Sequence, residues 1–174
     1  HSVTLFDKDQ QIGGQFNYAK QVPGKEEFHQ TIRYFERMLK LHAVNLQLGQ
    51  LQSVESLAEG GFDEVVLATG IVPRHLDLPG ADHPKVLSYL NVLRDHQHVG
   101  AKVAIIGAGG IGFDVAEYLT EPHSLTLQPE AWLKEWGIDK DYQSRGALLK
   151  DAASEVPARK IFLLQRKNSK VGSG

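Results

Sequence analysis

The feature that most constrains this chain is a glycine pattern, in which Gly107, Gly109 and Gly112 are spaced as Gly-x-Gly-x-x-Gly. The pattern directly follows the apolar run Lys102–Ile106 and opens a segment with the composition of a helix. At such a strand-to-helix turn the first glycine allows the tight turn, and the second lets a pyrophosphate approach the backbone. The third lets helix and strand pack closely, and the free N–H groups at the start of the helix attract phosphate. The pattern therefore predicts a dinucleotide site, with a plain glycine-rich turn as the alternative.

The end of the next strand predicts which dinucleotide is bound. In a site of this kind the second strand normally ends in an acidic residue that binds the 2′-hydroxyl of the ribose. Here the next apolar run is Ile161–Leu164, and Gln165, Arg166 and Lys167 follow it. An acidic residue would repel a 2′-phosphate, whereas Arg166 and Lys167 attract one. The sequence therefore favours NADP over NAD, and a solvated basic strand end is the alternative.

A second strand of this type stands near the start of the sequence, where Val3 to Phe6 lead into Asp7. Asp7 closes the run in the manner of an acidic ribose ligand, but no glycine pattern precedes it in this sequence. Val3–Asp7 is therefore predicted to be the second strand of another nucleotide-binding fold, whose first βα unit is absent from this segment. An ordinary strand end is the alternative.

Apolar spacing predicts several further elements. Residues 26–41 carry apolar side chains at helical spacing, and residues 44–48 alternate in the manner of a half-buried strand. The short apolar run 64–68 predicts another strand. Ser88 is expected to cap a short helix that continues to about His96.

Residues 121–159 are predicted to be a long insertion between the helix that follows the glycine pattern and the last strand. Trp132 and Trp136 lie four positions apart, so one face of a helix could pack both rings. We expect a surface helix held by these two aromatic side chains. A protein-interaction domain is the alternative that this insertion alone supports.

Composition excludes several classes of function. The 19 basic and 21 acidic residues give a net charge of −2, which predicts no nucleic-acid partner. No apolar run is long enough to span a membrane, and the absence of a signal peptide makes the cytoplasm the expected location. Without cysteine, this segment can form no disulfide, thiolate zinc site or iron–sulfur cluster. The eight histidines lack metal-ligand spacing, so no metal site is expected.

Several strings together resemble the bacterial NADPH-dependent 2,4-dienoyl-CoA reductases, over nearly the whole chain. The strings are Leu5–Asp7, Ile12–Asn17, Pro23–Phe28, Ala68–Arg74, His83–Tyr89, Glu135–Asp139 and Leu164–Lys167. The resemblance implies an α/β fold class, with Rossmann-like FAD- and NAD(P)-binding folds in a three-layer parallel sheet that is truncated here. Residues 1–72 would be part of the FAD-binding domain. Residues 73–174 would be part of the NADPH-binding domain, with the insertion at 121–159.

The resemblance also implies a reaction and its cofactors. In that family, hydride passes from NADPH to FAD, and electrons then reach FMN through a 4Fe-4S cluster and reduce a dienoyl-CoA. The FMN, the cluster and the catalytic residues would lie outside this segment, so no catalytic residue is assigned here. The partners expected are the small-molecule cofactors and the remaining domains of the parent enzyme. Exposed sheet edges in a truncated chain invite strand pairing, which would give a homodimer.

The resemblance assigns cofactor-binding roles by position. Asp7 would hold the adenosine ribose of FAD, Gly14, Gln15 and Lys25 would lie along that cofactor, and the backbone near Gln52 would meet the adenine. The turn would cradle the pyrophosphate of NADPH, and the two cations would bind its 2′-phosphate; these residues are Gly107, Gly109, Gly110, Gly112, Arg166 and Lys167. Because the first FAD glycine loop is missing, the segment alone is expected to bind FAD poorly. A nucleotide-binding structural module, as in amine dehydrogenases, is the alternative function.

Overall fold

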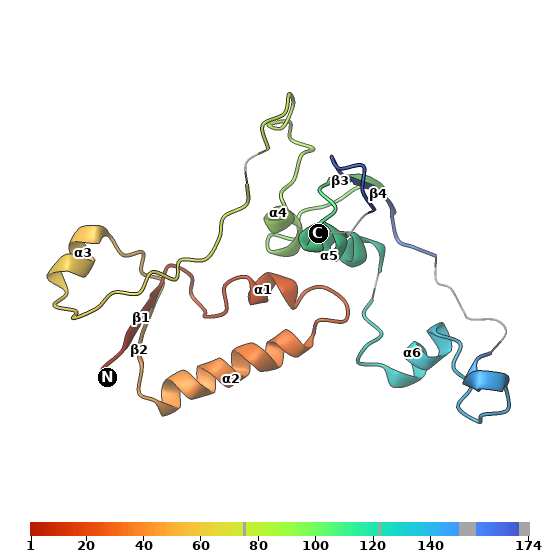
Figure 1. The fold of residues 1–174 in the computed structure, drawn as a ribbon, viewed down its shortest axis with the longest axis horizontal. Helices are drawn as coiled ribbons and strands as arrows, with labels where there is room; N and C mark the ends of the chain where they lie inside the picture. Colours follow the sequence, from red (N-terminus) through yellow and green to blue (C-terminus); the bar gives the residue numbers. More distant parts are fainter. Residues whose placement is uncertain (75, 122, 150–155, 171–174) are drawn as a thin grey trace. The chain divides into compact units, whose positions relative to one another are not determined.

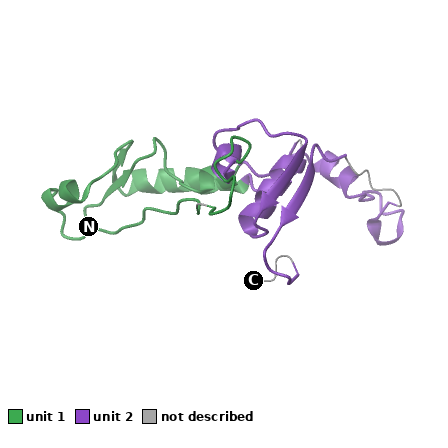
Figure 2. Ribbon diagram, turned by 90° about the horizontal axis from the view of Figure 1, so that it is seen from above, with its two compact units in different colours: residues 1–20, 27–86 green, residues 21–26, 87–174 purple. Residues whose placement is uncertain are grey.

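The computed structural model describes residues 1–74, 76–121, 123–149 and 156–170 (Figure 1). The chain forms two compact units (Figure 2). Unit 1 contains residues 1–20 and 27–86, and unit 2 contains residues 21–26 and 87–174. Helices alternate with parallel strands in both units, which confirms the predicted α/β fold class. No helix in the described parts is long and apolar enough to cross a membrane.

Unit 1 is built on two parallel strands, β1 (Thr4–Asp7) and β2 (Asn45–Leu48). The connection between them contains α1 (Phe16–Ala19) and α2 (Glu27–Leu41), as parallel pairing requires a long crossover. The predicted helix over 26–41 is confirmed. The two helices meet through aromatic side chains, because the ring centroids of Phe16 and Phe28 lie 4.8 Å apart.

The rest of unit 1 differs from the prediction at one strand. Helix α3 (Val54–Glu59) begins with a capping box between its N-cap Ser53 and Ser56. The run 64–68 that follows has no regular structure, and Val66 is 88% exposed. The predicted strand is therefore wrong. An extended apolar run becomes a strand only when a neighbouring strand pairs with it. In the described part of unit 1 the only two strands that pair are β1 and β2, so the run 64–68 has no partner strand.

Unit 2 is built on β3 (Lys102–Ile106) and β4 (Lys160–Leu164), which pair in parallel register from Lys102↔Lys160 to Ile106↔Leu164. Helix α5 (Gly110–Thr120) packs against both strands, and helix α4 (Tyr89–Leu93) packs against α5. The buried apolar side chains of this unit come from the segment before α2 and from the two helices: Val22, Val92, Leu93, Val115 and Leu119.

Two details of unit 2 correct the sequence predictions. Ser88 caps α4 as expected, but the helix ends at Leu93 rather than near residue 96, and His96 adopts a φ of +50° that a helix cannot continue. The expected three-layer sheet would cover both faces of β3, but Ile106 on this strand is 59% exposed. The face of the sheet that carries Ile106 and Phe162 is exposed, so only the helix-and-sheet layers of the expected three-layer fold occur among the described residues.

The insertion forms a small structure of its own. Helix α6 (Pro129–Glu135) is followed by a loop that returns through the isolated bridge Ile138↔Leu148 and the short 3₁₀ helix η1 (Arg145–Ala147). Trp132 lies on α6 and Trp136 caps its end, with ring centroids 5.7 Å apart. Trp136 is 61% exposed, so the expected surface helix with two neighbouring aromatic rings is confirmed.

Candidate dinucleotide site

The glycine turn of unit 2 lies at the carboxyl ends of β3 and β4. Gly107 has a φ of +118°, a conformation that residues with a side chain rarely adopt. Its N–H donates to the carbonyl oxygen of Leu164 at 2.8 Å, which ties the turn to the last residue of β4. Ligands of proteins with parallel α/β sheets bind at the carboxyl ends of the strands.

Gly112 and Gly109 shape the two sides of the turn. A Cβ atom on Gly112 would lie 1.9 Å from the carbonyl oxygen of Gly107, so only glycine lets α5 pack this closely on the turn. Gly109 is the N-cap of α5, and a Cβ atom on Gly109 or Gly110 would meet nothing within 4 Å. Both glycines are exposed, and the first-turn N–H groups of α5 have no acceptor inside the helix. The turn thus fits a pyrophosphate.

The predicted 2′-phosphate residues leave the sheet beside this turn. Because Ile106 pairs with Leu164, the segment after β4 starts beside Gly107, at the carboxyl ends of the two strands. Arg166 and Lys167 lie in this segment and are exposed. The side chain of Gln165, the first residue after β4, donates from Nε2 to the carbonyl oxygen of Ser169 at 2.5 Å. Two positive charges therefore stand on a short closed loop next to the glycine turn.

The predicted FAD residues fall in both units. Asp7, Gly14, Gln15 and Gln52 belong to unit 1, whereas Lys25 belongs to unit 2. The carboxylate of Asp7 accepts a hydrogen bond from the N–H of Asp9 at 2.9 Å. Asp7 pairs with Leu48 at the carboxyl ends of β1 and β2. Asp7 and the segment that leads to Gln52 therefore leave the sheet of unit 1 at the same end.

The other two FAD candidates of unit 1 stand at the start of α1. Gly14 has a φ of +45° and its carbonyl oxygen accepts from the N–H of Asn17, while Gln15 is the N-cap of α1. The side chain of Gln52 accepts a hydrogen bond from the hydroxyl of Ser56 at 3.0 Å, outside the loop that contains Gly14.

Lys25 forms an ion pair that the sequence did not predict. Its Nζ lies 2.6 Å from Oδ1 of Asp114 on α5, although the two residues are 89 positions apart. A partner so distant in sequence leaves no local signal. Glu117, one turn further along α5, has its pKa raised by partial burial and by the negative charge of Asp114.

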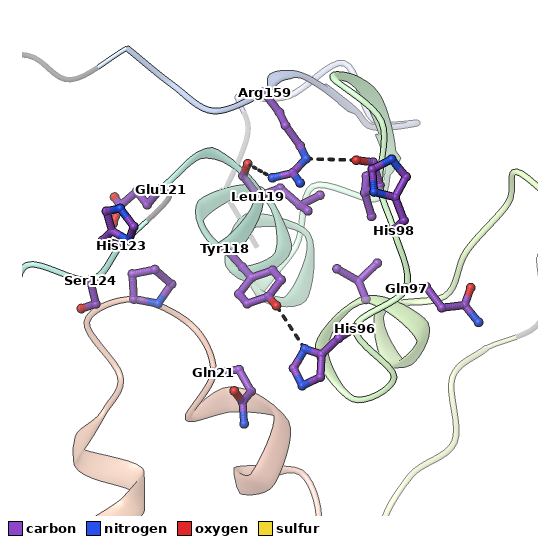
Figure 3. A pocket seen from close by; sticks show the side chains of 13 residues that line it. Gln21, His96, Gln97, His98, Tyr118, Leu119, Glu121, His123, Ser124 and Arg159 are labelled. Atoms are coloured by element: carbon purple, nitrogen blue, oxygen red, sulfur yellow. Dashed lines mark hydrogen bonds between the residues drawn. The ribbon is translucent and has the colours of Figure 1, made fainter.

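A pocket of about 420 Å³ lies at the other end of α5 (Figure 3). Arg159 donates to the carbonyl oxygens of Val99 and Leu119 there, at 3.3 Å and 3.1 Å, and the Tyr118 hydroxyl lies 3.2 Å from Nδ1 of His96. Val99 precedes β3 and Arg159 precedes β4, so this pocket lies at the amino ends of the two strands. The glycine turn lies at their carboxyl ends. Among the described residues no group of three or more metal-ligating side chains occurs.

Comparison with known proteins assigns the family. Residues 1–128 match the pyridine nucleotide-disulphide oxidoreductase family. The chain belongs to this family. With the fold described above, membership establishes a Rossmann-like oxidoreductase fold that binds FAD and NAD(P). The cysteine-free sequence itself supplies no redox-active disulfide.

Individual relatives are reductases with different substrates in their names. The chain is 39% identical over 126 residues to a cinnamate reductase from Clostridium sporogenes, and 32% identical over 124 residues to a bilirubin reductase from Mediterraneibacter gnavus. Each alignment covers 70% of this chain but only 18% and 19% of the relative, so the chain spans about a fifth of their length.

A solved structure of 2-naphthoyl-CoA reductase, in complex with 2-naphthoyl-CoA, is similar with a TM-score of 0.65 and 29% identity. The similarity covers 68% of this chain and 18% of that one. The expected relationship to flavoprotein reductases is thus confirmed at the level of the family. The narrower assignment to 2,4-dienoyl-CoA reductase stays a prediction.

Proposed function

We propose that this chain is the part of an NADPH-dependent flavoprotein reductase, similar to 2,4-dienoyl-CoA reductase, that binds NADPH and FAD. One observation carries the proposal: the glycine turn is bonded to the end of β4, and the loop that leaves β4 at this edge carries Arg166 and Lys167. A pyrophosphate cradle and a cationic loop side by side suit a dinucleotide with an additional phosphate on its ribose.

Each part of the site has a defined task. The first-turn N–H groups of α5 bind the pyrophosphate of NADPH, and Arg166 and Lys167 neutralise its 2′-phosphate. Asp7, Gly14, Gln15, Lys25 and Gln52 contribute to binding FAD. When bound, these two cofactors supply hydride transfer from nicotinamide to flavin. We assign residues 1–72 to the FAD domain and 73–174 to the NADPH domain.

The names of the relatives support an enoyl-type substrate for the whole protein. Cinnamate and 2-naphthoyl-CoA, in the names of two of them, both carry a carbonyl group conjugated to unsaturated carbon. We therefore propose reduction of an enoyl- or dienoyl-CoA, as in fatty acid β-oxidation in the cytoplasm. FMN and a 4Fe-4S cluster would act outside this segment, in the remaining domains of the enzyme.

Anaerobic reduction of the flavin tests this function. The intact protein is mixed with NADPH or NADH, and the loss of oxidised-flavin absorbance is followed. NADPH should bleach the flavin at a lower concentration than NADH, and substitution of Arg166 and Lys167 by Ala should remove the difference. A flavin that neither nucleotide reduces would contradict the proposal.

A second candidate is a nucleotide-binding structural module of an amine-dehydrogenase-like flavoprotein. A similarity favours it, because the chain is 31% identical over 129 residues to an N,N-dimethylglycine/sarcosine dehydrogenase from Chromohalobacter salexigens. A structural module has no need to select a 2′-phosphate. The same experiment separates the two candidates, since the structural module predicts no reduction of the flavin by NADPH.

A further inference from the structure

We infer that Gln165 is a positioning residue that sets the preference for a 2′-phosphate, by closing the loop that carries Arg166 and Lys167. The inference rests on the proposed function and goes beyond it. Arg166 and Lys167 supply the positive charge that binds the 2′-phosphate. Gln165 fixes the position of the loop that carries them, and as a neutral residue it adds no negative charge beside the 2′-phosphate.

The first argument is the position of Gln165. It is the residue directly after Leu164, whose carbonyl oxygen accepts a hydrogen bond from the N–H of Gly107. An acidic residue at the end of this strand binds the 2′-hydroxyl in sites that prefer NAD. Gln165 has nearly the shape of glutamate but no charge, so it does not repel a 2′-phosphate.

The second argument is the hydrogen bond across the loop. Nε2 of Gln165 donates to the carbonyl oxygen of Ser169, four residues further on, at 2.5 Å. The bond encloses Arg166 and Lys167, and the N–H of Gly107 anchors the start of the loop. A closed loop loses less conformational freedom when its long cationic side chains bind a phosphate, so closure strengthens binding without a contact of its own.

These two arguments predict different effects for different substitutions. Gln165→Met keeps the length of the side chain but removes the donor, so it opens the loop and adds no charge. Gln165→Glu also removes the donor, places a carboxylate against the Ser169 carbonyl and repels a 2′-phosphate. A carboxylate at this position can accept a hydrogen bond from a free 2′-hydroxyl.

The experiment measures binding of two small probes to the intact protein by calorimetry. Adenosine 2′,5′-bisphosphate carries the 2′-phosphate, and 5′-AMP lacks it. Gln165→Met should weaken binding of the bisphosphate by about 3- to 10-fold, as loss of one hydrogen bond does, and leave 5′-AMP unchanged. Gln165→Glu should weaken the bisphosphate by about 30-fold or more and leave 5′-AMP unchanged or tighter.

A matched control exists in the same unit. Gln143 is also exposed and donates from Nε2 to a backbone carbonyl, that of Asp141, at 2.8 Å, but it lies in the insertion. Gln143→Met should change neither affinity. Gln165→Asn, which keeps the amide but is too short to reach Ser169, should behave like Gln165→Met.

The outcomes separate this inference from the proposed function. If Gln165→Met and Gln165→Asn keep the wild-type ratio of the two affinities while Arg166→Ala lowers it, the role of Gln165 is overturned and the NADPH site stands. If the joint substitution of Arg166 and Lys167 by Ala leaves the ratio unchanged, the NADPH site itself fails. Equal losses for both probes would indicate general damage to the turn and would also overturn the role of Gln165.

Discussion

At the scale of single residues, Gly112 holds helix α5 against the glycine turn. Its substitution by Ala would bring a Cβ atom to 1.9 Å from the Gly107 carbonyl oxygen, which is backbone and cannot rotate away. We expect Gly112→Ala to lower the free energy of unfolding of unit 2 by about 3 kcal/mol, as overpacking at a rigid contact does. Chemical denaturation followed by circular dichroism measures the change.

Gly110 provides the control for that substitution. A Cβ atom on Gly110 would meet nothing within 4 Å. Gly110→Ala should therefore change the free energy of unfolding by less than about 1 kcal/mol, in the stabilising direction expected for Ala in a helix. Similar losses for both variants would contradict the close contact between Gly112 and the turn.

Glu117 makes the stability of unit 2 depend on pH. Partial burial and the nearby Asp114 raise the pKa of Glu117 above its ordinary value of 4.5, so the folded state binds more protons than the unfolded state just above that pH. The contribution of Glu117 to stability must therefore fall as pH rises from about 4.5 through its raised pKa. Glu117→Gln should make the protein more stable than the wild type near neutral pH, with a smaller difference below that range. Denaturation curves with the same pH dependence in both proteins would contradict this.

Single residues also show how far sequence reasoning reached. Gly107, Gly109 and Gly112 were predictable because each answers a local steric need and their spacing records it. The ion pair of Lys25 with Asp114 was not, because its partners are 89 positions apart and neither neighbourhood differs from that of other charged residues. Contacts of this kind arise from packing alone.

At the scale of elements, the insertion is organised by the carboxylate of Asp139. Asp139 is 8% exposed, and its two oxygens accept hydrogen bonds from the N–H groups of Ser144 and Asp141, at 2.6 Å and 3.0 Å. The bond from Ser144 lowers the pKa of Asp139 more than burial raises it. The loop is therefore stabilised above the ordinary pKa of 3.8 and loses that stabilisation as pH falls below it.

Substitution of Asp139 tests this role. Asp139→Ala should speed hydrogen exchange of the Ser144 and Asp141 amides by about tenfold, because both lose their acceptor. Asp141→Ala, which changes the neighbouring exposed carboxylate, should leave the exchange of the Ser144 amide nearly unchanged. Unchanged protection in Asp139→Ala would show that the loop is held by other contacts.

The strands separate what sequence predicts about elements from what it does not. The runs at β1, β2, β3 and β4 were all predicted, and each has a parallel partner in the structure. The run 64–68 is equally apolar yet remains irregular. Apolar composition indicates that a segment prefers an extended and buried conformation. Whether it forms a strand depends on a partner strand elsewhere in the chain, which the sequence of the segment does not determine.

At the scale of the whole molecule, both sheets have two strands in the described part of the chain, so unpaired edges remain. Such edges form hydrogen bonds with other strands, and we expect the 174-residue chain to form a homodimer through them. Sedimentation equilibrium should give twice the chain mass of 19.3 kDa. A mass of 19.3 kDa at every concentration tested would contradict strand pairing between copies.

The central claim concerns the glycine turn and the cationic loop as one NADPH site, and calorimetric titration of the intact protein with NADPH and with NADH tests it most directly. Two charge-assisted contacts to the 2′-phosphate should make NADPH bind at least about tenfold more tightly than NADH. The preference should disappear when Arg166 and Lys167 are both replaced by Ala. Equal affinities of the wild-type protein for the two nucleotides would contradict the assignment.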